Sequence, residues 1–429
     1  MVRDALSVVP EAAPQPDVTA HDAVPRRSTF RALRSVPFRL YFAGQIASAS
    51  GSFLQQTAVG WLVLQITGSA ASLGLVLAAG GVPSLLLGPW GGSVADRFDL
   101  RRLLVVTQVL YAVLAGALWL LAATGHATVT AIVTVSVLTG VVGIVDSPAR
   151  QAFVGALVTS DDLSSAVSLN GVVMNSARVV GPAVAGALIV TVGTTPCFAV
   201  NALSYLAVIA ALLVIRPLGA AKRRAAGGVR EGLRYAAGRE QLWVPLTMMA
   251  LVGLLSFNFG VVLPVLADDT FHGSGGTYGL LSTMLSVGSV LGSLGVGFVP
   301  HPRRNYLIAA ALAFGVGLAL TALAPNVPAA CVTLLLTGFA AFSFVTLCST
   351  TLQLHSSPAY RGRIMALWVF VFMGTTPIGS TLTGAISSGA GPRVALVVGA
   401  GACVVAAAIA ARVHTPPHPD DRLTDLQPT

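Results

Sequence analysis

Long apolar stretches separated by short polar turns run along most of the chain. A transmembrane helix needs about 20 mostly apolar residues, and about twelve stretches of this length follow one another in the sequence. Their approximate centres are Ser52, Val82, Val113, Val137, Ser176, Ala207, Ser256, Ser289, Phe314, Gly338, Gly374 and Ala402. The pattern predicts an all-α integral membrane protein with twelve transmembrane helices.

A longer polar break at residues 216–241 divides these stretches into two groups of six. We therefore expect an N-terminal six-helix bundle at residues 38–215 and a C-terminal six-helix bundle at residues 242–412. Residues 1–37 are rich in proline, alanine and polar side chains, which is typical of a disordered tail. Residues 413–429 are expected to form a second tail.

The central break contains a short amphipathic pattern. Val229, Leu233, Ala236 and Ala237 share one face of a helix, while arginine and glutamate occupy the other faces. This pattern favours a helix that lies on the inner membrane surface. A binding site for a cytoplasmic partner is the alternative.

Charged residues are rare and lie almost entirely on one side of the predicted membrane. The chain is 55% hydrophobic and 10% charged, against about 25% charged in soluble domains. Of its 25 Lys and Arg residues, all except Arg178 and Arg393 fall on the side that holds the termini and the central break. This asymmetry places both termini in the cytoplasm. The net charge of +9 then faces anionic lipid headgroups, so nucleic acid is not expected as a partner.

The sequence lacks the common motifs of catalysis and metal binding. It has no G-K-S/T phosphate loop, no G-x-S-x-G nucleophile motif, and no H-E-x-x-H or C-x-x-C spacing. The four cysteines lie in or beside apolar stretches, where they are interpreted as small apolar fillers: Cys197, Cys331, Cys348 and Cys403. We therefore expect neither an enzyme nor a cofactor or metal site.

Acids and arginines cluster directly after a run of small residues in GPWGGSVADRFDLRRLL, which starts at Gly88. Gly88, Gly92 and Ala95 share a helical face, so another membrane helix can approach closely. Asp96 follows at the end of the second span, where the helix dipole disfavours an anion. Acids contribute little to membrane orientation. Asp96 therefore indicates a functional contact with donors from an arginine or another helix.

This stretch resembles the signature loop of the major facilitator superfamily, G-x-x-x-D-R-x-G-R-R, which lies between the second and third spans. The matching residues are Gly92, Asp96, Arg97, Arg101 and Arg102. Asp99 and Leu100 stand where the family has a glycine and the first arginine of the pair. The resemblance implies the major facilitator fold of two pseudo-symmetric six-helix bundles. It makes Asp96 the acid of a conformational latch, whose partner is the helix ending near Arg150 or the eleventh span.

A second resemblance lies in the fifth span. Gly181, Pro182 and Gly186 are similar to the G-P-x-x-G-G motif of antiporters of this superfamily, with Ala185 before the final glycine. Ordinary use of glycine and proline in a membrane helix is the alternative, because proline in mid-helix removes a hydrogen bond and permits a kink. Together with DSPARQAFVGALVTSDDLSSA after the fourth span, this region resembles the branch that contains siderophore and multidrug exporters.

Polar residues inside the spans are the candidates for a substrate cavity, because polar groups in lipid are costly. The first span carries a polar stripe, for which hydrogen bonding between helices is the alternative. The candidates are Gln45, Ser48, Ser52, Gln55, Asn170, Met174, Arg178, Asn258, Tyr278, Gln353 and Trp368. Arg178 lies near the middle of its span. It either attracts an anionic or carbonyl-rich substrate, or pairs with Asp146 or a helix C-terminus.

Asp146 lies four residues before Arg150 at the end of the fourth span, which suits a local ion pair. We interpret the pair as structural or gating, with a proton carrier as the alternative. As a whole, the sequence predicts a secondary active exporter of small amphipathic molecules of the drug, antibiotic or siderophore kind. We expect a monomer in the bacterial cytoplasmic membrane that is coupled to proton influx. An importer of the same fold and a membrane scaffold that transports nothing are the alternatives.

Overall fold

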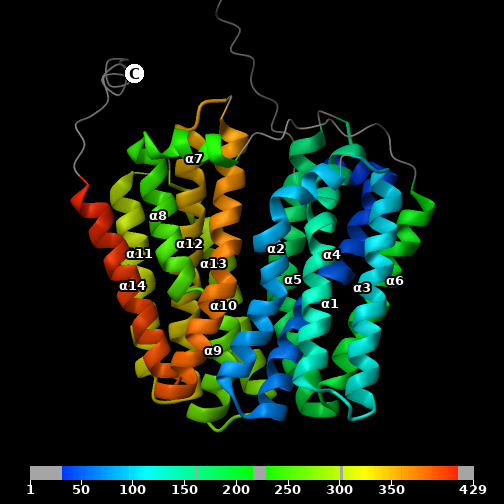
Figure 1. Cartoon of the computed structure of the whole chain (residues 1–429), viewed down its shortest axis with the longest axis horizontal. Coiled ribbons are helices and arrows are strands. Elements are labelled where there is room, and N and C mark those ends of the chain that lie inside the picture. Colours follow the sequence, from blue (N-terminus) through cyan, green and yellow to red (C-terminus); the bar gives the residue numbers. More distant parts are fainter. Residues whose placement is uncertain are drawn as a thin grey trace, which may run out of the picture.

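Two bundles of helices stand side by side (Figure 1). The computed structural model describes residues 31–95, 97–159, 162–215, 229–299, 303–358 and 360–413, and no strand occurs among them. After the short 3-10 helix η1 (Arg31–Arg34), the first bundle contains α1 (Val36–Thr67), α2 (Ala70–Ala95), α3 (Leu100–Ala123), α4 (Val129–Ala156), α5 (Leu163–Val192) and α6 (Thr195–Val214). The second contains α8 (Glu240–Leu255), α9 (Phe259–Val265), η3 (Leu266–Thr270), α10 (Gly275–Val296), α11 (Arg304–Leu323), α12 (Val327–His355), α13 (Arg361–Ala390) and α14 (Pro392–Arg412).

The predicted all-α fold accounts for these helices, and the structure adds a break in the seventh span between α8 and α9. Each predicted centre lies within a helix except Ser256, which lies in the break between α8 and α9. Eleven helices in the described ranges are long and apolar enough to cross a membrane. The remaining span, α1, is 32 residues long and carries the polar stripe, which lowers its mean hydropathy. The fold class predicted from the sequence is confirmed.

Apart from Arg393, the arginines at helix ends in the described residues gather at one end of the molecule, which is uppermost in Figure 1 and is called the basic end. The opposite end, called the loop end, holds the short turns, such as the one at Gly68. Gly68 ends α1 with a φ of 58° and donates its N–H to Leu64 O at 2.7 Å. A side chain would strain this left-handed backbone, so glycine suits the turn.

A further helix, α7 (Val229–Ala237), lies across the basic end of the second bundle (Figure 1). Its Tyr235 ring stacks on Tyr360 with centroids 4.1 Å apart, and Glu231 accepts from Arg363 at 2.9 Å. The Tyr235 hydroxyl also accepts from the backbone N–H of Ser357 at 3.2 Å. The amphipathic helix expected in the central break is thus anchored to the turn between α12 and α13.

The two bundles meet along two helix pairs, α2 with α13 and α5 with α10. Glycines make these approaches possible, since a Cβ at Gly279 would lie 2.5 Å from the Cα of Gly186. Gly74 similarly packs against the backbones of Ser380 and Gly384. These contacts lie in the half of the molecule nearer the loop end, and the ribbons of α2 and α13 diverge toward the basic end (Figure 1). Close backbone packing replaces the hydrophobic effect, which is weak between helices in lipid.

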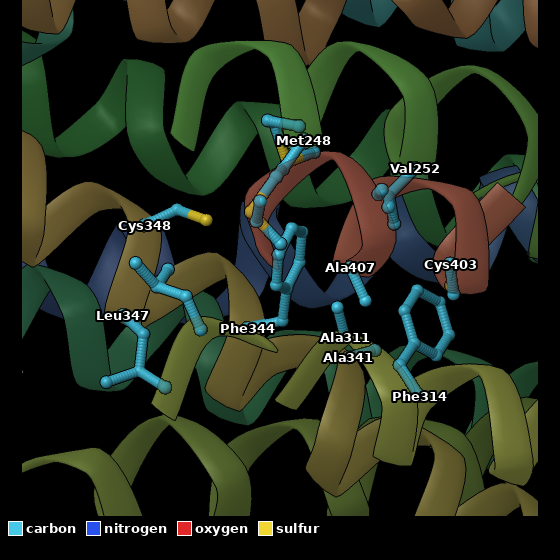
Figure 2. Packing of buried hydrophobic residues seen from close by; sticks show 14 of the residues in the cluster. Met248, Val252, Ala311, Phe314, Ala341, Phe344, Leu347, Cys348, Cys403 and Ala407 are labelled. Atoms are coloured by element: carbon cyan, nitrogen blue, oxygen red, sulfur yellow. The ribbon is translucent and has the colours of Figure 1, made fainter. Parts of the chain in front are cut away.

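The largest core lies inside the second bundle, among α8, α11, α12 and α14. Figure 2 shows Phe314 and Phe344 among the small side chains of Ala311, Ala341 and Ala407. Cysteines fill the same layer, because Cys348 and Cys403 are fully buried and free. Their burial among apolar side chains agrees with the interpretation of these two cysteines as small apolar fillers.

Candidate transport site

A buried ion pair lies inside the first bundle. Arg150 donates to Asp146 at 2.8 Å, as the four-residue spacing on α4 predicts. The other oxygen of Asp146 accepts from Thr107 at 2.7 Å and Gln108 at 2.9 Å, both on α3. Gln108 is buried, and its own Oε1 has no partner among the described residues. Both oxygens of the Asp146 carboxylate are therefore hydrogen-bonded, whereas the amide oxygen of Gln108 is not.

The polar stripe of α1 continues this network. Gln45 is buried, accepts a hydrogen bond from Arg150, and donates to the hydroxyl of Tyr41. Further along α1, Ser52 lies 3.2 Å from the Tyr205 hydroxyl of α6. The next stripe residue, Gln55, accepts from Asn201 of α6 at 2.8 Å, while Ser48 is buried. The hydrogen bonds of the stripe thus join α1 to α4 and α6 within one bundle.

Arg178 lies in the middle of α5, at the boundary between the bundles. Its guanidinium carbon is 5.8 Å from the ring centre of Phe53 on α1 and 4.6 Å from that of Phe342 on α12. Pairing with Asp146, the structural alternative, does not occur, because that carboxylate is occupied by α3 and Arg150. The other two candidates on α5, Asn170 and Met174, are half-buried like Arg178.

Aromatic side chains continue from Phe342 into the second bundle. The ring of Phe257, in the break of the seventh span, is 6.1 Å from Phe342, 5.1 Å from Phe314 and 5.8 Å from Phe372. Trp368 stacks on Phe372 at 6.3 Å. No pattern in the sequence singles out Phe342, because an aromatic residue in an apolar span usually serves packing.

Of the other three candidates in the second bundle, two lie apart from this row. Asn258 is buried and donates to the backbone oxygen of Leu254 at 2.8 Å. Tyr278 stacks on Trp61 of α1 at 6.4 Å, near the loop end. Gln353 is exposed near the basic end of α12. The structure therefore brings Trp368 together with the aromatic row, but not Tyr278 or Gln353.

The signature loop lies at the basic end, and Asp96 falls outside the described residues. Gly92 belongs to the last turn of α2, and both Arg97 and Arg102 are exposed. Asp99, which stands where the family has glycine, caps α3 by accepting from the Arg102 N–H at 2.9 Å. The departure from the motif therefore has a local structural reason.

Arg101 of the same loop reaches the end of α6. Its Nε donates to the backbone oxygen of Leu212 and its Nη2 to that of Leu213. These carbonyls belong to the last turn of the helix, where a cation is favourable. Arg101 therefore fastens α3 to α6 inside the first bundle.

The Gly-Pro segment of α5 packs against both bundles. Gly181 meets α1, since an added Cβ would lie 2.9 Å from the backbone nitrogen of Leu54. One turn later, Gly186 meets Gly279 of α10. Pro182 lies inside α5, which continues without a break. All three residues are buried, so this segment forms close helix contacts.

Among the described residues, no group of three His, Cys, Asp or Glu side chains could hold a metal ion.

Comparison with known proteins bears on the fold and the family of this chain. The fold is similar to that of a bacterial homologue of the human lysosomal transporter Spinster in an inward-facing, unoccupied conformation. The TM-score is 0.73 at 14% identity, covering 87% of this chain and 96% of that one. The predicted major facilitator fold is confirmed.

Curated relatives include the staphyloferrin A transporter of Staphylococcus aureus, which is 25% identical over 263 residues, 60% of this chain and 66% of that protein. The multidrug efflux pump Tap of Mycolicibacterium fortuitum is 25% identical over 376 residues, 83% of this chain and 90% of that protein. The family described as transmembrane secretion effector matches residues 27–427. The chain is a multi-pass membrane transporter rather than an enzyme, and it belongs to the transmembrane secretion effector family of the major facilitator superfamily.

Proposed function

We propose that this transporter exports small amphipathic molecules of the drug, antibiotic or siderophore kind by alternating access. The proposal rests on the packing of the two bundles through glycines at the loop end, combined with Arg178 at mid-depth between them, which has no acidic partner among the described residues. With the basic end in the cytoplasm, this conformation is closed to the outside and receives substrate from within. The name of the family and of the Tap efflux pump supports the outward direction.

The proposed passage lies where the bundles meet at mid-depth. In this proposal Arg178, Asn170 and Met174 of α5 and Phe342 of α12 line the passage. Charged side chains are rare within the described spans, which suits a substrate that already partitions into lipid. Proton influx supplies the driving force, and the transporter works as a monomer.

Transport into membrane vesicles tests the direction and the coupling. In inverted vesicles the lumen corresponds to the cell exterior. An acid lumen is expected to drive accumulation of amphipathic fluorescent compounds, because protons leaving the lumen exchange for substrate. A protonophore should abolish this accumulation, and vesicles that lack the protein give the background. Proton-driven accumulation only in right-side-out vesicles would contradict export and favour an importer.

Asp96→Asn tests the proposed latch. The variant is expected to lose transport but to insert and fold normally, because the carboxylate acts in the conformational cycle rather than in the fold. The measurement is proton-driven accumulation in inverted vesicles, with the thermal unfolding midpoint as a check of folding. The matched control is Asp99→Asn, which removes a nearby charge and keeps an equally good cap on α3. Normal transport by Asp96→Asn would refute the latch.

A further inference from the structure

Arg178 is a charge at mid-membrane depth that has no acidic partner among the described residues. The rings of Phe53 and Phe342 lie beside its guanidinium, and Asp146, an acid inside the described spans, is paired with Arg150. The other described acids lie at helix ends: Asp99, Asp162, Glu231, Glu240, Asp268 and Asp269. An unpaired arginine in a membrane protein is costly and faces a cavity or a ligand by default.

The rings that hold Arg178 come from different bundles. Phe53 belongs to α1 and Phe342 to α12. A ring face attracts a guanidinium, but it leaves the N–H donors of the fork without acceptors. Arg178 is only half-buried, so its fork remains accessible to a ligand. A carboxylate binds this fork with two charge-assisted hydrogen bonds, which are stronger than contact with a ring.

The second half of the site is apolar and aromatic. Phe342 begins a row of rings that continues through Phe257 to Phe372 and Trp368, with neighbouring centroids 5.8–6.3 Å apart. Such rings prefer stacked and edge-to-face partners. An aromatic body fits this row, whereas a cation would be repelled by Arg178.

We infer that Arg178 and Phe342 form a subsite for substrates that carry an anionic group on an aromatic body. The anion takes the guanidinium fork, and the aromatic body lies against the ring of Phe342. This inference rests on the proposed function and names the class of molecule that is exported. Because the two residues belong to different bundles, a ligand bound here contacts both halves of the transporter.

Binding of three matched probes to the purified full-length protein tests the inference. The probes are naphthoate, its neutral amide naphthamide, and the cation naphthylmethylammonium, measured by equilibrium dialysis. The wild-type protein is expected to bind naphthoate about tenfold or more tightly than naphthamide, because the acceptor of each hydrogen bond from Arg178 is then ionised as well as the donor. The cation is expected to bind most weakly.

Three variants test separately the charge of Arg178, the ring of Phe342 and a change of arginine far from the site. Arg178→Gln should abolish the preference for naphthoate and leave naphthamide binding within about twofold. Phe342→Leu should weaken naphthoate and naphthamide by similar factors, so their ratio is kept. Arg393→Gln is the matched control, because Arg393 donates to Ala324 O at 2.9 Å at the loop end and should leave the ratio unchanged.

Equal loss of all three probes in Arg178→Gln would show a structural arginine and overturn the inference. Wild-type binding of the cation or the amide as tight as that of naphthoate would overturn it as well.

Transport into vesicles distinguishes failure of the subsite from failure of the proposed export. If naphthoate binding depends on Arg178 but no compound accumulates in inverted vesicles, export is contradicted and the subsite is supported. If amphipathic compounds accumulate with no preference for anions, the subsite is contradicted and the proposed export is supported.

Discussion

Replacing Asp146 by asparagine is expected to destabilise the first bundle by about 3–5 kcal/mol, which is typical when one partner of a buried ion pair is removed. Asparagine places an NH2 group against donors, because one carboxylate oxygen accepts from Thr107 and Gln108 and the other from Arg150. It also leaves the charge of Arg150 unpaired between helices. The thermal unfolding midpoint in detergent should fall by on the order of 10 °C.

Two controls define the cause of this loss. The double variant Asp146→Asn/Arg150→Gln removes both charges and should recover much of the stability. Glu231→Gln removes the acid of an exposed pair, in which Arg363 lies 2.9 Å from the Glu231 carboxylate. Exposed pairs contribute about 1 kcal/mol or less, so its midpoint should stay near that of the wild type. An Asp146→Asn variant as stable as Glu231→Gln would contradict a structural role for the pair.

Gly279→Val is expected to abolish transport while the protein still inserts and folds. A Cβ at Gly279 would lie 2.5 Å from the Cα of Gly186 and 2.8 Å from the oxygen of Pro182, all backbone atoms that cannot move aside alone. The added side chain therefore separates α5 from α10 at the loop end. A transporter that cannot close this end cannot complete alternating access.

Proton-driven accumulation in inverted vesicles measures the loss of transport. The change of shape is measured by a cysteine at Ile189, which packs against Gly275 across the same interface, after the natural cysteines are replaced by alanine. Its reaction with a maleimide in the purified protein should become faster in Gly279→Val. Gly116→Val is the matched control, because no atom lies within 4 Å of a Cβ built there. Unchanged labelling and transport in Gly279→Val would show that this contact is dispensable.

The outcome at three positions shows where sequence reasoning succeeded and where it stopped. The spacing of Asp146 and Arg150 predicted an ion pair, and the structure confirms it, because four residues bring two side chains of one helix together. Asp99 departs from the family motif, and only the structure shows that its side chain caps the first turn of α3. The ring that meets Arg178 could not be predicted, since Phe342 lies 164 positions further along the chain.

The sequence alone determined the number of spans, the break between the bundles and the superfamily. It could do so because a bilayer imposes length and hydropathy on each helix separately, and the distribution of arginine records which side each turn is on. Which neighbouring helix each polar face contacts is seen only in the tertiary structure. The stripe of α1 meets α4 and α6, whereas Arg178 meets Phe342 of the other bundle. Helical periodicity defines a face, but the rotation of a helix toward its neighbours is set by packing between segments far apart in the chain.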